Sequence, residues 1–322
     1  MAQRKLVLVA LVVVLVGGVL YLNTPPALVN AAVAPQLPDD IETWLADNEG
    51  QVASQYTLIP DTEKRVTWYG QPGERTAYVV VNLHGFSATR QETAPLAERV
   101  ASALAANLFE TRLAGHGHAQ RPMDAVQAED WLDDAAEALA IGARLGEKIV
   151  VIGTSTGGTL ALAMHDHPSA RTISDIVLIS PNLQPRDGKA SWLTRPAGPL
   201  IARLVAGDTR SWDAHNELQA RYWSTSYPIE AAVEVMRLVD LLNSRLPMQL
   251  EQNLLVLQSP EDKVVSADAT RQAFERISAP RKRFIEIEDA EDPSHHVLAG
   301  DILAPNSTVK IAAAIVRFVA GP

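Results

Sequence analysis

The sequence predicts an α/β fold built on a mostly parallel sheet, and two observations lead to this prediction. Apolar runs rich in β-branched residues alternate along the chain with stretches whose apolar residues recur at helical spacing. This alternation is typical of parallel strands joined by right-handed helical crossovers. In addition, the apolar run 149–152 ends in Gly153-Thr154-Ser155-Thr156-Gly157, and a helix-compatible stretch follows. That order predicts a sharp turn from strand to helix with a serine at its tip.

Taken in chain order, the elements give a sheet of eight strands flanked by helices. An antiparallel pair is expected first, at 56–59 and 64–69, joined by a turn at Pro60-Asp61. Six parallel strands follow, and their density of β-branched residues favours burial on both faces. These strands are expected at 77–83, 107–112, 148–152, 175–180, 253–258 and 283–288. The helices between them are expected at 95–105, 128–145, 158–165, 268–277 and 309–319.

One segment interrupts the alternation and predicts an inserted cap at about 183–250. It has no strand pattern, but residues 228–242 place apolar residues on one helical face. We expect this insertion to cover the carboxyl edge of the sheet. Its aromatic residues either attach the cap to the body or line an apolar ligand pocket, and together they favour the pocket. They are Trp192, Trp212, Tyr222, Trp223 and Tyr227.

The N-terminus predicts an export signal. Arg4 and Lys5 precede an unbroken apolar run at 6–22, so residues 1–22 are expected to be a signal anchor or a signal peptide. The positive flank would keep the N-terminus in the cytoplasm and place the rest outside it, in the periplasm or extracellular space. The protein would then be membrane-anchored, or secreted if the segment is cleaved. Residues 23–50 are expected to form a tether that includes a short helix, and residues 51–322 the globular domain.

Composition excludes several classes of function. The net charge is −10 with a pI near 5.3, and no basic stripe indicates a nucleic-acid partner. The absence of cysteine excludes disulfides, thiolate chemistry and cysteine-based metal sites. Two His-x-His pairs, at 116–118 and 165–167, have no accompanying carboxylate pattern. We therefore expect no metal and no other cofactor.

Residues able to activate the serine follow later strands. A free hydroxyl is a weak nucleophile, so Ser155 requires a base within hydrogen-bonding distance. The strand expected at 283–288 leads to His295-His296, and either histidine is a candidate base. The strand at 253–258 ends just before Asp262, the preferred acid to orient the imidazole. Two other carboxylates remain open as alternatives, Glu261 beside it and Asp240 in the expected cap helix.

These motifs resemble those of the α/β-hydrolase superfamily, nearest to its branch of monoglyceride-lipase-like enzymes and bacterial carboxylesterases. The resemblance rests on the Gly-x-Ser-x-Gly turn, the chain order serine, aspartate, histidine, and the loop Leu113-Ala114-Gly115-His116-Gly117. It covers about residues 55–320. The stretch Ser294-His295-His296-Val297 is similar to the family's Ser-x-His-Val pattern, which favours His296 over His295 as the base.

The resemblance also implies further roles. The strand that ends at His84-Gly85 would place the Phe86 N–H in an oxyanion hole together with the N–H of Thr156, the residue after the nucleophile. His84 would orient this loop through its side chain, while His116 and His118 would shape the neighbouring Gly-His-Gly loop rather than react.

The activity implied is that of a serine hydrolase acting through an acyl-enzyme intermediate without a cofactor. The expected substrates are carboxylic esters, either monoacylglycerols or other short-to-medium acyl esters, and the N-terminal segment implies the membrane as a partner. An alternative is an aminopeptidase or amidase of the prolyl-iminopeptidase kind. It would require an acidic cluster for the substrate amine, with Glu217, Glu230 and Glu234 as candidates. A non-catalytic membrane-tethered binding protein is a further alternative, although all three residue types of a triad are present.

Overall fold

A computed structural model describes residues 5, 17, 18, 20, 21 and 23–321. The expected signal anchor or signal peptide at 1–22 therefore lies largely outside the described residues. Among the helices of the described part, none combines the length and the apolar character needed to span a bilayer.

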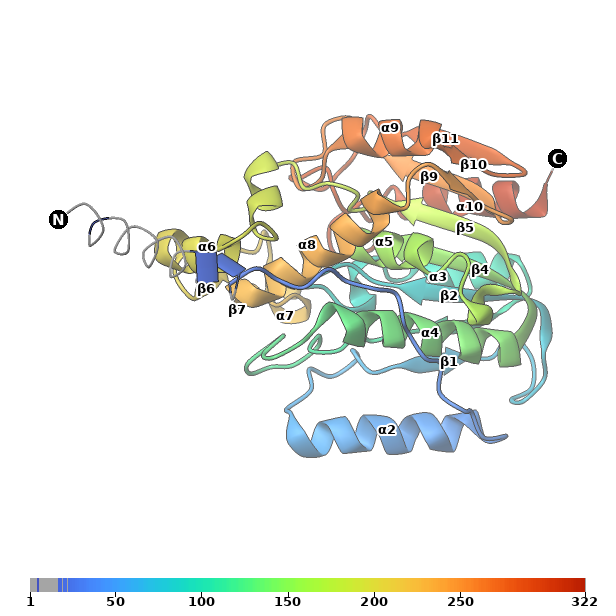
Figure 1. The fold of residues 1–322 in the computed structure, drawn as a ribbon. Coiled ribbons are helices and arrows are strands. Elements are labelled where there is room, and N and C mark those ends of the chain that lie inside the picture. Colours follow the sequence, from blue (N-terminus) through green and yellow to red (C-terminus); the bar gives the residue numbers. More distant parts are fainter. Residues whose placement is uncertain (1–4, 6–16, 19, 22, 322) are drawn as a thin grey trace.

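The described chain forms one central sheet with helices on both faces (Figure 1). Its seven strands have the order β1-β3-β2-β4-β5-β9-β11, and all neighbours are parallel except β1 and β3. Six of these strands confirm the expected parallel core. The bounds are β1 Arg65–Thr67, β2 Thr76–Leu83, β3 Asn107–Glu110, β4 Gly146–Thr154, β5 Ile173–Ile179, β9 Asn253–Gln258 and β11 Lys282–Glu286.

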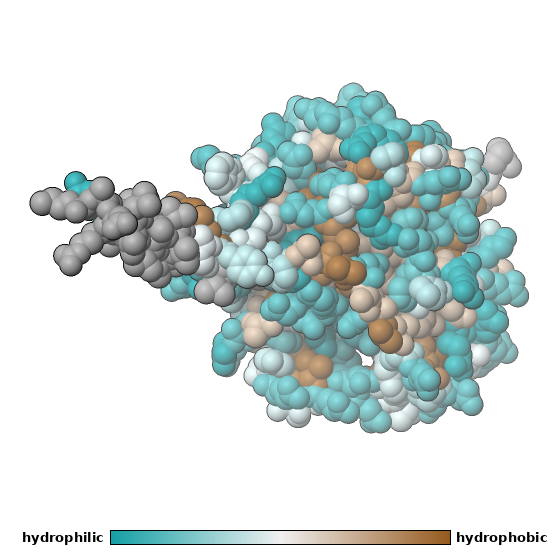
Figure 2. Space-filling model, viewed as in Figure 1, coloured by the Kyte–Doolittle hydropathy of each residue, from teal (hydrophilic) through white to brown (hydrophobic). Residues whose placement is uncertain are grey.

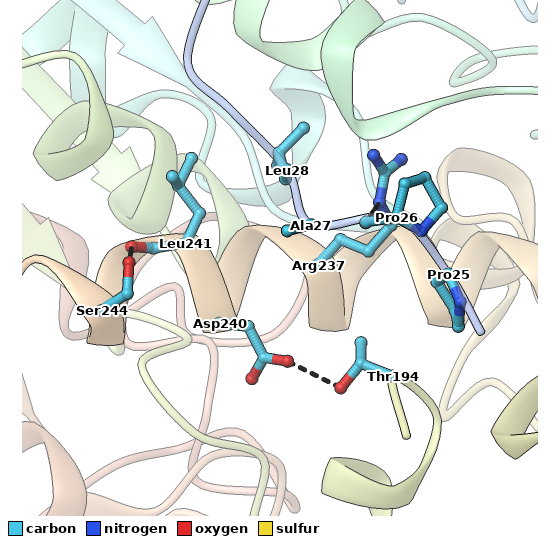
Figure 3. Close-up of a pocket in the computed structure, with 9 residues that line it drawn as sticks. All are labelled: Pro25, Pro26, Ala27, Leu28, Thr194, Arg237, Asp240, Leu241 and Ser244. Carbon is cyan, nitrogen blue, oxygen red and sulfur yellow. Dashed lines mark hydrogen bonds between the residues drawn. The ribbon is translucent and has the colours of Figure 1, made fainter. Parts of the chain in front are cut away.

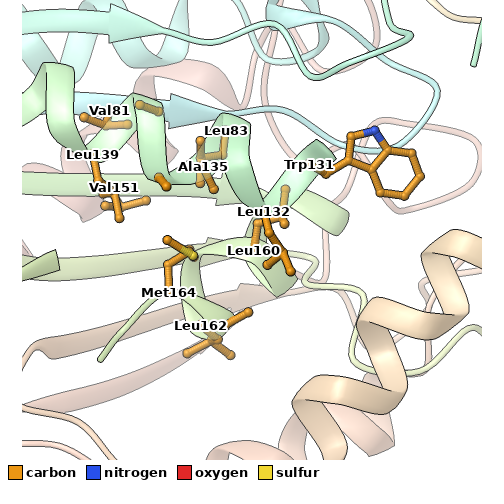
Figure 4. Close-up of a cluster of buried hydrophobic side chains, with 14 of the residues drawn as sticks. Val81, Leu83, Trp131, Leu132, Ala135, Leu139, Val151, Leu160, Leu162 and Met164 are labelled. Carbon is orange, nitrogen blue, oxygen red and sulfur yellow. The ribbon is translucent and has the colours of Figure 1, made fainter. Parts of the chain in front are cut away.

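The side chains of alternate residues in each strand pack into two separate hydrophobic cores, because successive side chains of a strand point to opposite faces of the sheet. Val79 and Val81 pack in one core, and Val80 between them packs in the other. The first core lies under α4 (Ala128–Leu145) and α5 (Thr156–Ala163), as Figure 4 shows. The second lies under α3 (Leu96–Ala103) and α10 (Thr308–Ala320). The remaining crossover helix is α9 (Ala267–Arg276).

The prediction of eight strands was wrong for the described residues, because the first strand of the expected antiparallel pair does not form. Residues 56–59 make only an isolated bridge, from Leu58 to His118. Their backbone groups bond to another loop: the Ile59 N–H donates to Gly117 O at 2.8 Å, and the Ala119 N–H donates to Thr57 O at 2.8 Å. The segment therefore closes over the Gly-His-Gly loop instead of extending the sheet.

An insertion between β5 and β9 forms the cap (Figure 1). Its elements are the 3₁₀ turn Gly188–Trp192, α6 Gly198–Ala206, β6 Thr209–Ser211, α7 Glu217–Tyr222, β7 Ser226–Pro228 and α8 Ile229–Ser244. The expected cap helix is α8. The expectation of no strands was wrong, because β6 and β7 pair antiparallel. These strands have three residues each and β6 is exposed, so they carry no apolar alternation. After the cap, β8 (Met248–Gln249) pairs with β10 (Ile277–Ser278).

The segment that precedes the sheet lies along the surface of the folded body. Arg237 of α8 donates from Nε to Pro26 O at 3.1 Å, and Asn30 donates to Ala163 O at the end of α5 at 2.8 Å. Leu28 is buried between these contacts. Residues 25–28 form one wall of a cavity of about 290 Å³ whose opposite wall is α8 (Figure 3). Farther along, α2 (Ile41–Gln55) begins at Asp40, whose side chain accepts from the Thr43 N–H.

Candidate active site

Ser155 occupies the sharp turn between β4 and α5, with φ 51° and ψ −116°. Both glycines of the motif are required by close contacts. A Cβ on Gly157 would lie 2.0 Å from Leu83 O, and one on Gly153 would lie 2.5 Å from Gly157 O. No side chain larger than hydrogen fits at either position. The positive φ of the serine is a strained conformation held by the surrounding structure, a feature that clusters at functional sites.

Asp262 and His296 form a buried pair. His296 Nδ1 lies 2.9 Å from Asp262 Oδ2, and the aspartate side chain has no solvent exposure. The other oxygen, Oδ1, accepts from the Val264 N–H at 2.8 Å and from the Val265 N–H at 2.9 Å. The carboxylate is thereby fixed, and the bond to Nδ1 leaves Nε2 of the imidazole as the nitrogen able to accept a proton.

The loops of the serine and the histidine meet at the end of β5. The Ser155 N–H donates to Ile179 O at 2.9 Å, and the next residue, Ser180, donates from its hydroxyl to His296 O at 2.7 Å. Adjacent residues of one strand end therefore hold both loops. The structure thus brings Ser155, Asp262 and His296 to the carboxyl edge of the sheet, where ligands bind in open α/β sheets.

The protonation states of the pair are shifted in opposite directions. Burial acts to lower the pKa of His296, but the charge and hydrogen bond of Asp262, with Glu92 and Asp292 behind them, raise it above its usual value. Burial acts to raise the pKa of Asp262, but His296 and the two backbone N–H donors lower it. Each partner therefore favours the charged form of the other, which stabilises an imidazolium formed during a reaction.

The residues considered as alternatives for the base and the acid do not form a comparable pair at this edge of the sheet. His295 Nδ1 is 3.6 Å from Glu261 Oε2, and the Glu261 side chain is mostly exposed. That distance is too long for a hydrogen bond. Asp240 lies on α8, where it accepts from Thr194 Oγ1 at 2.6 Å beside the N-terminal segment (Figure 3).

The two N–H groups expected in an oxyanion hole are available. Neither the Phe86 N–H nor the Thr156 N–H donates to an acceptor among the described residues. Thr156 is also the first residue of α5, where the helix dipole favours negative charge. Both groups belong to residues near Ser155: Thr156 follows it in the chain, and Gly85, the residue before Phe86, packs against it, since a Cβ on Gly85 would lie 3.1 Å from the Ser155 Cβ.

Two buried histidines hold the Phe86 loop. His84 Nδ1 lies 2.9 Å from Gly85 O, and its Nε2 accepts from the Leu113 N–H. His116 Nε2 accepts from the Ser87 N–H at 3.0 Å, so this imidazole is neutral. Burial lowers the pKa of His84 to about 4 and that of His116 well below its usual value. Both imidazoles are therefore uncharged at neutral pH, and their hydrogen bonds hold this loop in place.

Two buried carboxyl groups beside the site were not found by sequence reasoning. Asp292 accepts from the N–H groups of His296 and Val297, each at 3.0 Å, and so fixes the histidine loop. An aspartate two residues before a serine, as in Asp292 and Ser294, only weakly predicts a turn held by the aspartate side chain. Glu92 accepts from the Gly85 N–H at 2.7 Å. It lies in a polar loop after the first core strand, and no local pattern identifies it.

Cap aromatics pack against the loop that carries Phe86 and Ala88. The Phe86 ring packs edge-on against Tyr227 with centroids 4.9 Å apart. Tyr222 and Trp223 of the cap form a small apolar cluster with side chains from both active-site loops, Ala88, Val297 and Leu303. The Ser224 N–H ties the cap to the loop by donating to Ser87 O at 2.6 Å. Trp192 is the exception among the cap aromatics named from the sequence, because it is exposed.

The chain is similar to several lipolytic enzymes. A thermostable monoacylglycerol lipase from Bacillus sp. (strain H-257) is 26% identical over 254 residues, which cover 79% of this chain and 94% of the lipase. The solved structure of the metagenome-derived lipolytic enzymes LipS and LipT aligns with TM-score 0.66 and 23% identity, over 82% of this chain and 99% of that one. A monoacylglycerol lipase from Paleococcus ferrophilus aligns with TM-score 0.57 and 16% identity, over 80% and 98%.

These solved structures share the fold described above. A family model described as serine aminopeptidase, S33, matches residues 74–298, which run from just before β2 to the loop that carries His296. The matched range therefore contains the serine turn, the cap and the Asp262–His296 pair. The chain belongs to this family of α/β-hydrolases.

Proposed function

We propose that this protein is a serine hydrolase that cleaves carboxylic esters. The observation that carries the proposal is the fixed Asp262–His296 pair, held at the same strand end as the strained Ser155 turn. The similarity to a monoacylglycerol lipase supports esters as the substrate class.

In the proposed reaction, Ser155 Oγ attacks the ester carbonyl carbon while His296 Nε2 takes the hydroxyl proton. The carbonyl oxygen becomes an anion stabilised by the N–H groups of Phe86 and Thr156, each worth roughly 3 kcal/mol. His296 then protonates the departing alcohol, which leaves an acyl group on Ser155. A water molecule, deprotonated by His296, releases the acid and restores the serine. Asp262 orients the imidazole and stabilises its cation throughout.

The substrate proposed is a monoacylglycerol or another short-to-medium acyl ester. Apolar side chains from the cap and both loops surround the oxyanion loop, as expected for a site that accepts an acyl chain. The peptidase alternative requires free carboxylates in the cap. Glu234 instead pairs with Arg237, and Glu230 pairs with Arg203. Two of the three candidate acids are thus neutralised, which disfavours recognition of a substrate amine.

A series of p-nitrophenyl esters from acetate to palmitate, with proline p-nitroanilide alongside, tests this proposal on the full chain in detergent. We expect turnover of the esters with a maximum at one chain length, which would also measure the acyl pocket. Turnover of the anilide alone would contradict the ester proposal and favour the peptidase alternative. Failure to turn over any of these compounds would contradict the ester proposal and favour the binding-protein alternative.

We propose also that residues 1–22 attach the enzyme to a membrane with the hydrolase domain outside the cytoplasm. The apolar run 6–22 behind Arg4 and Lys5 supports this placement. The described chain that follows reaches the body at the cap, where Pro25 and Pro26 face Thr194. The cap, rather than the opposite end of the molecule, would then lie next to the lipid surface.

An exposed apolar face on α6 supports this orientation. Ile201, Leu204 and Val205 have the spacing of one helical face and are 49%, 78% and 82% exposed. Figure 1 places α6 at the end of the molecule where the described chain begins, drawn in blue, and Figure 2 shows hydrophobic surface at that end. Residues 183–228 carry six Lys and Arg against four Asp and Glu, in a chain of net charge −10. This charge favours an anionic lipid surface as the partner of α6.

A spin label can measure whether α6 enters the lipid, because the chain has no native cysteine. We expect a nitroxide at Leu204→Cys in the full chain, reconstituted into anionic vesicles, to be accessible to oxygen and shielded from a polar nickel complex. The matched control is Val309→Cys on α10, also exposed and apolar, which should remain in water. Equal exposure of both labels to the nickel complex would contradict the orientation. Spin–spin broadening of the Leu204→Cys spectrum in the absence of lipid would show that this face of α6 binds a second copy of the chain instead.

A further inference from the structure

Glu92 lies between the two loops that carry the proposed oxyanion donor and the proposed base. It ends the 3₁₀ turn Arg90–Glu92 and is 3% exposed. Its backbone abuts the loop that follows His296: a Cβ on Gly300 would lie 2.6 Å from Glu92 O. Two residues after this turn, Ala94 is tied to the same loop, because its carbonyl oxygen accepts from the Asp301 N–H at 2.8 Å. Movement of this turn would displace both loops.

The Glu92 side chain points to the other loop. Its Oε2 accepts from the Gly85 N–H at 2.7 Å, in the His84–Gly85 peptide, which precedes the peptide that carries the Phe86 N–H. A Cβ on Gly85 would lie 2.9 and 3.0 Å from the two carboxyl oxygens and 3.1 Å from the Cβ of Ser155. The carboxyl group and the Ser155 side chain therefore both approach the position that a side chain of residue 85 would occupy. The absence of a side chain at Gly85 allows this approach.

The charge of Glu92 acts on the proposed base. The titratable groups that act on Glu92 are His296 and Asp292, and the Gly85 N–H is its hydrogen-bond donor. Burial raises the pKa of Glu92 to about 7, although the Gly85 hydrogen bond and His296 act to lower it. In the ionised form, Glu92 in turn raises the pKa of His296, after Asp262 and ahead of Asp292.

We propose that Glu92 is a positioning residue for the reaction: its carboxyl group fixes the His84–Gly85 peptide, next to the Phe86 N–H of the proposed oxyanion hole, and its charge acts on His296. This inference rests on the proposed ester hydrolysis. The two contributions are separable, because the hydrogen bond requires only an acceptor oxygen, whereas the effect on His296 requires a charge.

Two substitutions separate the contributions. Glu92→Gln keeps an acceptor oxygen for the Gly85 N–H and removes the charge. We expect its kcat at high pH to stay within about 3-fold of the native value, and the acid limb of kcat/KM to move to lower pH. Glu92→Ala removes the acceptor as well. We expect kcat to fall roughly 10–100-fold with KM nearly unchanged, less than the loss of a whole oxyanion donor. Glu98→Gln on α3 is the matched control, since Glu98 pairs with Arg65 and should alter neither quantity.

The charge effect can also be measured without turnover, by NMR titration of the His296 imidazole in the full-length protein. We expect a lower pKa of His296 in Glu92→Gln than in the native protein and in Glu98→Gln. An unchanged His296 pKa would overturn the electrostatic part, and native kcat in Glu92→Ala would overturn the positioning part. A protein that turns over no ester but shows the NMR shift would contradict the proposed function alone, so the two failures are distinguishable.

Discussion

Ser155→Ala is expected to reduce ester hydrolysis at least 10⁴-fold, because it removes the only atom that can carry the acyl group. Among the described residues, none accepts or donates a hydrogen bond that would tie the Ser155 hydroxyl into the turn, and the strained backbone is held by Gly153 and Gly157. The substitution should therefore leave the fold intact. Single-turnover hydrolysis of the best p-nitrophenyl ester measures the loss, and the thermal unfolding midpoint of the variant should match that of the native protein.

Ser174→Ala provides the control for this prediction. Ser174 lies near the start of β5, where its hydroxyl donates to Ile149 O at 3.3 Å, away from the carboxyl edge. Its removal should leave turnover unchanged. Retention of more than about 1% of native activity by Ser155→Ala, in a correctly folded variant, would exclude Ser155 as the nucleophile. The oxyanion hole and substrate binding alone account for only a small residual rate.

An element of this fold could be predicted from the sequence where the pattern that specifies it lies within the element's own residues. Residues 128–145 were predicted as a helix and form α4 with the same bounds, because the apolar stripe that packs on the sheet is visible in the sequence. The strand expected at 56–59 has a suitable composition but bonds to residues 117–119. That choice depends on the path of a distant loop, which local pattern does not contain.

The same distinction applies to the site. The Ser155 turn could be predicted because its requirement for glycine is local: Gly153 and Gly157 contact the backbone within a few residues or at the adjoining strand end. Glu92 and Asp292 could not, because their importance comes from contacts made only after two loops fold together. A buried carboxyl in a polar loop has the same local pattern as an exposed one, so tertiary contacts alone reveal it.

The doubled histidine gives a sharp second prediction: His296→Ala should lower kcat/KM by roughly 10⁴-fold or more, and His295→Ala by less than about 10-fold. The reason is geometric. His296 is buried and bonded to Asp262 at 2.9 Å, whereas His295 is 3.6 Å from the exposed Glu261. Only the first pair fixes an imidazole with Nε2 free to accept the serine proton.

The two variants are matched controls for each other, because they remove the same side chain from adjacent residues of one loop. His295 has a positive φ of 55°, so the change at 295 tests the loop backbone as well as the side chain. Comparable losses in both variants, with lowered unfolding midpoints, would mean that the loop had collapsed. In that case His296→Gln, which keeps polarity and bulk, measures the base. A larger loss at His295 than at His296 would move the base by one residue and assign Glu261, in place of Asp262, as its partner.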